Sequence, residues 1–112
     1  MKGVYLLVDT DYNLCKIGMS TQLKNRVTHL NNIYNFDLIE SLFLLTTYPP
    51  NRLETTLHFL FREFKSVHPK ELDGYTEFYA LTNKFINMMR YFIAKYSKQE
   101  RFKVYRFDQV YK

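Results

Sequence analysis

The sequence predicts one α+β domain in which a small three-stranded antiparallel sheet is flanked by three helices, in the order β-β-α-β-α-(β)-α. Two apolar runs near the N-terminus are separated by turn-forming residues, a pattern typical of a β-hairpin. A long apolar and β-branched run at 36–47 indicates a buried central strand. Three other segments space their apolar residues three and four positions apart, as amphipathic helices do. A chain of 112 residues can bury one hydrophobic core of this kind, but not two.

The first half of the chain is expected to form the sheet and one helix. The hairpin strands are predicted at 4–8 and 14–17, with Asp, Thr, Tyr and Asn in the turn between them. Ser20 and Thr21 are residue types that cap helices, and the apolar spacing after them predicts a helix that ends near 31–32. The buried stripe of this helix is predicted to be Leu23, Val27 and Leu30.

The second half is expected to add two helices and a short extended segment. The first of these helices starts near Asn51, after the prolines that end the third strand. Proline, aspartate and glycine predict a loop at 66–74, which is followed by an extended piece at 76–81 and a helix at 83–96. The inner face of the helix near Asn51 is predicted to be Leu53, Leu57, Leu60, Phe61 and Phe64.

A basic and aromatic tail at 98–112 is expected to pack on, or extend from, the domain at 1–97, as an edge strand or a flexible arm. Residues 1–56 hold equal numbers of basic and acidic side chains, so the net charge of +5 comes entirely from the second half. This clustering suits a phosphate-rich partner, and the alternative is a solvated face that keeps the protein in solution. The residues predicted to contact nucleic acid are Lys84, Arg90, Lys98, Arg101, Lys103 and Arg106.

Cysteine usage and hydropathy favour an intracellular protein, in the cytoplasm or inside a host cell. The one cysteine, Cys15, cannot form an intrachain disulfide, which suits a reducing compartment, and it reads as a small buried strand residue. No segment approaches the roughly 20 apolar residues that span a membrane, and the start of the chain does not resemble a signal peptide. Neither secretion nor a membrane partner is therefore expected.

Several short motifs occur in a characteristic order between residues 3 and 81. The set is Gly3-Val4-Tyr5, Lys16-Ile17-Gly18, Arg26, Glu54-Thr55-Thr56-Leu57-His58 and Glu77-Phe78-Tyr79-Ala80-Leu81. This ordered set resembles the GIY-YIG nuclease superfamily, and in particular its phage and large-DNA-virus branch, which has Lys-Ile-Gly as its second motif. The resemblance implies an endonuclease that hydrolyses phosphodiester bonds of DNA, with RNA as the alternative polymer.

The resemblance also implies a role for each matched residue. Glu54 would hold a single divalent metal, Mg²⁺ or Mn²⁺, and no organic cofactor is expected. Tyr5 would orient or deprotonate the attacking water, while the guanidinium of Arg26 would bind phosphate oxygens. Lys16 would place a positive charge at the phosphate or lower the pKa of Tyr5. His58, one helical turn from Glu54, would carry a proton.

Four of these residues also have structural interpretations. Tyr5 can be a strand tyrosine whose hydroxyl satisfies a backbone group, and His58 can be an interfacial helix residue. Glu54 stands three positions after Asn51, a spacing that matches a capping box at the start of a helix. Arg26 borders a buried stripe, where an arginine commonly pairs with a surface acid such as Asp37 or Glu40. The residues by themselves therefore allow both a catalytic and a structural interpretation of these side chains.

Departures from the superfamily pattern favour an alternative function. Lys16 stands where many relatives have a second tyrosine, and only Asn83 and Asn87 are candidates for an asparagine that follows the metal-binding glutamate. A catalytically degenerate module that binds nucleic acid or a host protein is the alternative. A third reading, a structural protein with a coincidental motif, predicts that Tyr5, Arg26, Glu54 and His58 do not converge.

No separate sequence-reading domain is expected within this length. Specificity would then be low, or would come from DNA structure or from a protein partner. The sequence assigns no role to His29 or His68, and it leaves the oligomeric state open.

Overall fold

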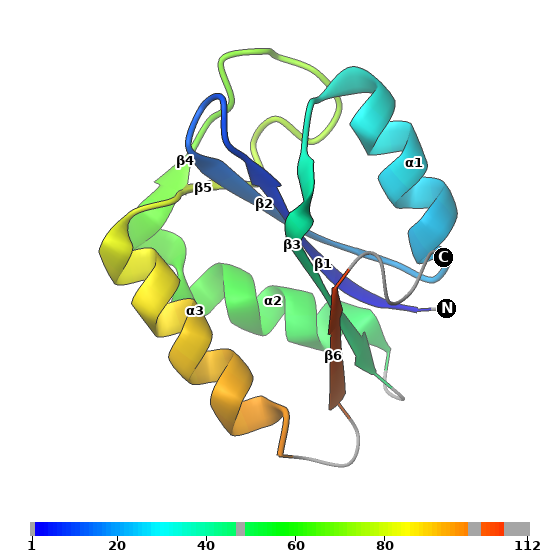
Figure 1. Cartoon of the computed structure of the whole chain (residues 1–112), viewed down its shortest axis with the longest axis vertical. Coiled ribbons are helices and arrows are strands. Elements are labelled where there is room, and N and C mark those ends of the chain that lie inside the picture. Colours follow the sequence, from blue (N-terminus) through cyan, green and yellow to red (C-terminus); the bar gives the residue numbers. More distant parts are fainter. Residues whose placement is uncertain (1, 47–48, 99–101, 107–112) are drawn as a thin grey trace.

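The computed structural model describes residues 2–46, 49–98 and 102–106, and within these ranges the chain has an α+β fold (Figure 1). Its sheet has six antiparallel strands in the order β4-β5-β2-β1-β3-β6. The expected three-stranded sheet is therefore wrong, although the α+β class holds. The strands are β1 (Gly3–Asp9), β2 (Leu14–Ser20), β3 (Asp37–Thr46), β4 (Lys65–Ser66), β5 (Phe78–Ala80) and β6 (Phe102–Arg106).

The N-terminal hairpin forms as predicted. Strands β1 and β2 pair antiparallel, so that Tyr5 lies opposite Gly18. Asn13 closes the turn with a φ of 55°, a left-handed conformation that asparagine adopts more readily than most residues. The hairpin therefore fixes which residues of the two strands face each other at the centre of the sheet.

The three additional strands lie at the two edges of the sheet. Strand β5 pairs with β2, and the two-residue β4 pairs with β5. On the other side, β6 pairs with the second half of β3 and is an edge strand. Where β6 no longer covers β3, Ile39 is 74% exposed, so β3 is only partly the buried strand that its sequence predicts.

The helices cover both faces of the sheet (Figure 1). Alternate residues of β1 point to opposite faces, and Leu7 packs with α1 (Leu23–Ile33). Leu6 packs with α2 (Pro50–Leu60) and α3 (Asn83–Tyr96) in a second core. The first core takes Leu23, Val27 and Leu30 from α1, and the second takes Leu53, Leu57, Phe85, Met89 and Phe92 from α2 and α3.

Helices α2 and α3 begin in different ways. Helix α3 has the predicted bounds, and the side chain of its cap Thr82 accepts a hydrogen bond from the Phe85 amide. Helix α2 begins with proline at its first turn and has no side-chain cap, so the capping-box interpretation of Glu54 is wrong. Within the described ranges, no helix is long and apolar enough to cross a membrane.

Candidate functional site

The side chain of Tyr5 lies over Gly18 in the second strand of the hairpin. A Cβ added at position 18 would lie 2.2 Å from the Tyr5 hydroxyl oxygen, so any larger residue would displace the phenol. The Tyr5 side chain is buried on the α1 face of the sheet. The glycine of the second motif therefore makes room for the tyrosine of the first.

Lys16 lies on the same face, completely buried. Its Nζ forms an ion pair with Glu77 Oε2 at 2.5 Å, and it lies 3.5 Å from the Gly74 carbonyl oxygen. Burial lowers the pKa of Lys16, while the hydrogen bond and charge of Glu77 oppose that change. Because the ammonium is enclosed and paired, it offers no open contact to a polymer phosphate.

The phenol of Tyr5 is surrounded by charged groups of three other elements. Burial raises the pKa of Tyr5 to about 12, and the hydrogen-bonded guanidinium of Arg26 opposes this rise. The negative charges of Glu77 and Glu54 raise the pKa further. Lys16 is not among the groups that shift this pKa, and with a pKa of about 12 Tyr5 remains a neutral phenol near pH 7.

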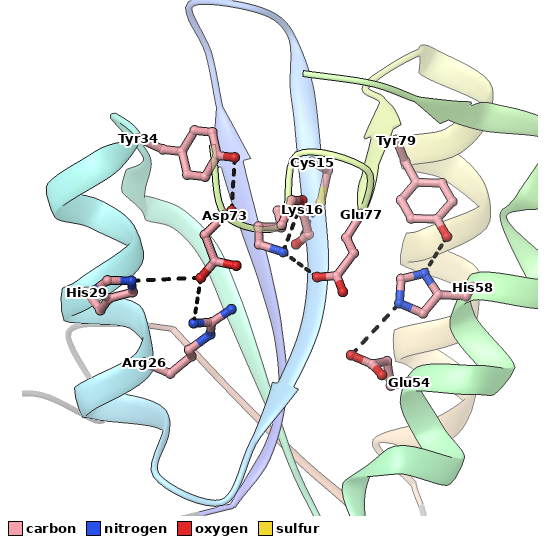
Figure 2. Close-up of polar contacts among 11 residues, drawn as sticks. Cys15, Lys16, Arg26, His29, Tyr34, Glu54, His58, Asp73, Glu77 and Tyr79 are labelled. Carbon is pink, nitrogen blue, oxygen red and sulfur yellow. Dashed lines mark hydrogen bonds and ion pairs between the residues drawn. The ribbon is translucent and has the colours of Figure 1, made fainter. Parts of the chain in front are cut away.

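Arg26 reaches the site from α1. Its Nη1 donates to Asp73 Oδ2 at 3.0 Å, and His29 Nε2 lies 3.8 Å from the same oxygen. The Tyr34 hydroxyl donates to the Asp73 backbone carbonyl at 3.0 Å, which holds this part of the loop beside α1 (Figure 2). The partner of Arg26 is thus a residue of the 66–74 loop, and the expected pairing with Asp37 or Glu40 is wrong.

Glu54 and His58 reach the site from α2. His58 Nε2 lies 3.9 Å from Glu54 Oε2, and both side chains are about one quarter exposed. On its other side, His58 Nδ1 is hydrogen-bonded to the hydroxyl of Tyr79 on β5 (Figure 2). The α2 surface therefore presents a carboxylate and an imidazole that are already linked to a buried phenol.

The structure brings all five sequence-predicted site residues together. Figure 2 shows α1 with Arg26 on one side of the hairpin and α2 with Glu54 on the other, with Glu77 between them. Tyr5 links the two sides, since its pKa responds to both Arg26 and Glu54. A coincidental motif would have left these residues scattered, which is not observed. The polar site, as we call it, consists of the five residues Tyr5, Lys16, Arg26, Glu54 and His58 with their partners Asp73, Glu77 and Tyr79.

Three partners in the polar site had no role in the sequence analysis. Glu77 and Tyr79 belong to a motif of the sequence, so the motif could have identified them as candidate site residues. Their contacts could not be predicted from it. Asp73 carried only the signature of a turn before Gly74. What a carboxylate in a loop contacts depends on where the loop folds back, which no local pattern encodes.

A buried histidine anchors the loop that supplies these partners. His68 Nε2 donates to Asp9 Oδ2 at 2.8 Å, and the Lys70 amide donates to His68 Nδ1 at 3.0 Å. Both side chains of the His68–Asp9 pair are at most 2% exposed. The pair ties the loop to the end of β1 and so places Asp73 and Glu77 beside the hairpin.

The residues predicted to contact nucleic acid lie on other elements. Among those with described side chains, Lys84, Arg90, Lys98 and Lys103 are exposed, and Lys84 lies 3.5 Å from Glu63. They come from α3, its C-terminal turn and β6, and none of them contacts the polar site. Arg106 belongs to β6 by its backbone, and Arg101 lies outside the described residues, as does most of the tail at 98–112.

The donor set of the polar site fits a hard divalent cation. In the described ranges, no three His, Cys, Asp or Glu side chains gather as a metal-binding group. Glu54 offers a carboxylate that is 24% exposed, and Mg²⁺ commonly binds through one or two carboxylates while it keeps several waters. The residues therefore fit Mg²⁺ or Mn²⁺ at Glu54, and they do not fit a zinc site with four protein ligands.

Alkaline unfolding should report the buried phenols. Burial raises the pKa of Tyr5, Tyr34 and Tyr79 from 10.0 to about 12. Between these values the unfolded chain has released protons that the folded chain retains, so the free energy of unfolding should fall as pH rises from 10 to 12. Denaturant titrations across this range, followed by tyrosine absorbance, would measure the fall.

Two other buried groups, Cys15 and Lys16, also change the free energy of unfolding at alkaline pH. The lowered pKa of Lys16 acts in the opposite sense, since stability rises with pH until it reaches the ordinary lysine value of 10.5. Measurements that start at 10.5 therefore exclude Lys16 and report the phenols together with the buried Cys15 thiol, whose pKa burial raises from 9.0 to about 12. A free energy of unfolding that stays constant from there to pH 12 would contradict the prediction.

Comparison with known proteins identifies one family. Residues 2–94 match the T5orf172 domain, and this range contains every residue of the polar site. The domain is related to nuclease-type domains from phage. Searches of curated proteins and of solved structures returned no match.

Proposed function

The chain belongs to the T5orf172 domain family, and from this premise we propose that it is a metal-dependent endonuclease that hydrolyses DNA phosphodiester bonds. The observation that carries the proposal is the convergence of Tyr5, Arg26 and Glu54, which come from β1, α1 and α2. Tyr5 interacts with Arg26 and with the charge of Glu54, so a phenol, a guanidinium and a carboxylate of this site would supply a hydrogen-bond donor, a phosphate ligand and a metal ligand. These are functions that metal-dependent phosphodiester hydrolysis uses.

Arg26 is assigned to the phosphate. Its planar guanidinium can bind two phosphate oxygens at once, which suits the charge that develops in the transition state. Asp73 occupies one of its donors in the free protein and is itself 54% exposed. A phosphate would therefore exchange with Asp73, whose carboxylate can turn to solvent without leaving a buried charge unpaired.

Tyr5 is assigned to orientation rather than to proton abstraction. With a pKa of about 12, the phenol is protonated near pH 7 and acts as a hydrogen-bond donor. It can hold the attacking water or a phosphate oxygen next to Arg26. Lys16 packs next to the phenol: its Nζ lies 5.8 Å from the centre of the Tyr5 ring, and its charge is neutralised by Glu77.

Glu54 is assigned to the metal. A bound Mg²⁺ or Mn²⁺ would offset negative charge on the phosphate as a Lewis acid. The quarter-exposed carboxylate of Glu54 can be reached from solvent while Tyr79 and His58 hold the protein side of the site. The exposed basic residues Lys84 and Arg90 of α3 are assigned to the DNA backbone outside the scissile phosphate.

A binding module without catalysis is the second candidate. It is favoured by the pairing of both site cations, since Asp73 holds Arg26 and Glu77 holds Lys16. Such a module would keep the family scaffold and bind nucleic acid or a protein partner through its exposed basic residues. The two candidates differ in one property, which is bond cleavage.

Plasmid nicking separates the candidates. Supercoiled DNA is incubated with the protein and Mg²⁺ or Mn²⁺, beside a reaction that contains EDTA. Conversion to the open circular form that requires the metal supports the endonuclease. Gel retardation without cleavage supports the binding module, and the absence of both contradicts a nucleic-acid function. Parallel reactions with single-stranded RNA test the alternative polymer.

A further inference from the structure

Tyr79 is a buried polar group that the proposed function has not used. It lies on β5, where it pairs across the sheet with Cys15, and its side chain is 1% exposed. Its ring stacks on Phe85 of α3 with a centroid distance of 6.2 Å, which limits its movement. Among the described residues, the hydrogen-bond partner of its hydroxyl is His58 Nδ1.

The burial of Tyr79 decides the direction of this hydrogen bond. A buried hydroxyl must place its proton on an acceptor, because an unsatisfied buried donor is costly. Water cannot reach this hydroxyl in quantity, and the nitrogen lone pair of His58 Nδ1 is the acceptor that the described residues provide. Burial also raises the pKa of Tyr79 to about 12, so the phenol has a proton to donate.

The donation fixes the protonation of the imidazole. A neutral imidazole carries one N–H and one lone pair, so Nδ1 as acceptor leaves the proton on Nε2. His58 Nε2 is the atom that faces Glu54 Oε2, at 3.9 Å. The N–H of His58 is therefore on the nitrogen that faces the carboxylate.

We propose that Tyr79 is a positioning residue that holds His58 in the Nε2–H form, and that His58 in turn orients the Glu54 carboxylate. The proposal rests on the assignment of Glu54 to the metal. In this arrangement His58 is a donor towards the site and does not accept a proton from the attacking water. Partners of this kind, which touch a metal ligand rather than the metal, fix ligand orientation and strongly affect metal sites.

The nitrogen chemical shifts of the His58 ring test the first part of the proposal. In alkaline buffer, where imidazole is neutral, ¹⁵N NMR distinguishes the protonated ring nitrogen from the unprotonated one. The wild-type protein should show the proton on Nε2, and Tyr79→Phe should shift the ring towards a mixture of the two forms. Protonation of Nδ1 in the wild type, or identical His58 spectra in wild type and Tyr79→Phe, would overturn the proposal.

Tyr34→Phe is the matched control. It also removes one buried hydroxyl, which donates to the Asp73 carbonyl on the opposite side of the hairpin. The His58 ring should keep the wild-type tautomer in this variant. A shift as large as that of Tyr79→Phe would assign the effect to general loosening of the fold and would overturn the specific role of Tyr79.

Cleavage kinetics test the second part. Tyr79→Phe should lower metal-dependent nicking by about 10-fold to 100-fold, as is usual for residues that orient a metal ligand, with unchanged DNA retardation. Unchanged nicking would overturn the link between His58 and Glu54. Because the NMR experiment needs neither metal nor DNA, it tests the tautomer even if the wild-type protein cuts nothing, which would contradict only the proposed function.

Discussion

Glu54→Gln should abolish metal-dependent nicking of plasmid DNA while the protein stays folded. The substitution keeps the size of the side chain and removes the carboxylate charge that binds Mg²⁺. Charge stabilisation by a metal contributes several kcal/mol, so a loss of about 3 kcal/mol predicts a rate at least ~100-fold lower. Nicking rates at saturating Mg²⁺, compared with the wild type, measure the effect.

The fold should tolerate this change. Glu54 is 24% exposed and does not cap α2, so its replacement removes no hydrogen bond on which the helix end depends. Glu40→Gln, which removes an exposed carboxylate from β3 instead, is the matched control and should cut like the wild type. If Glu54→Gln retained the wild-type rate, Glu54 would not be the metal ligand, whatever the family resemblance implies.

Glu77→Gln should be the most destabilising conservative substitution in the polar site. It leaves the ammonium of Lys16 wholly buried without its charged partner, so that only neutral acceptors, the new amide oxygen and the Gly74 carbonyl at 3.5 Å, remain to hydrogen-bond it. Breaking a buried ion pair in this way typically costs 3–5 kcal/mol. Because the Glu77 side chain is 43% exposed and already screened by water, we expect a smaller loss of about 2 kcal/mol in the free energy of unfolding.

Lys16→Met should have a much smaller effect on stability. Methionine fills a similar volume without a charge, and the freed Glu77 carboxylate can be solvated. The double variant Lys16→Met/Glu77→Gln should therefore recover most of the stability that Glu77→Gln alone loses. Urea titrations of the four proteins measure this coupling, and strictly additive losses would show that the two side chains act independently.

The helices and the hairpin could be predicted from the sequence because their signals are local. The bounds of α3 followed from apolar residues three and four positions apart, and the hairpin from turn formers between two apolar runs. The motif order also identified Tyr5, Arg26 and Glu54 as candidates before any contact was known. The matched T5orf172 domain supports a nuclease-like or nucleic-acid-binding module at this coarser level.

Local signals gave no sign of β4, and they indicated β5 and β6 only as an extended piece at 76–81 and as one of two readings of the tail, without their places in the sheet. Strands β4 and β5 have two and three residues, too few to show an alternating pattern. They exist because β2 offers unpaired backbone groups to β5, and β5 then offers its free edge to β4. Strand β6 could be read either as an edge strand or as an arm, and its pairing with β3 decided between them.

The sequence by itself determined which side chains could carry chemistry, since residue type and order are all that a motif records. The tertiary structure decided their partners: Arg26 meets Asp73 across 47 positions, and Lys16 meets Glu77 across 61. These contacts depend on how the loop is anchored by His68 and Asp9, which is a property of the packed chain. The charge states of Tyr5 and Lys16 follow from their burial and from these neighbours, because burial and neighbouring charges set the pKa of a side chain.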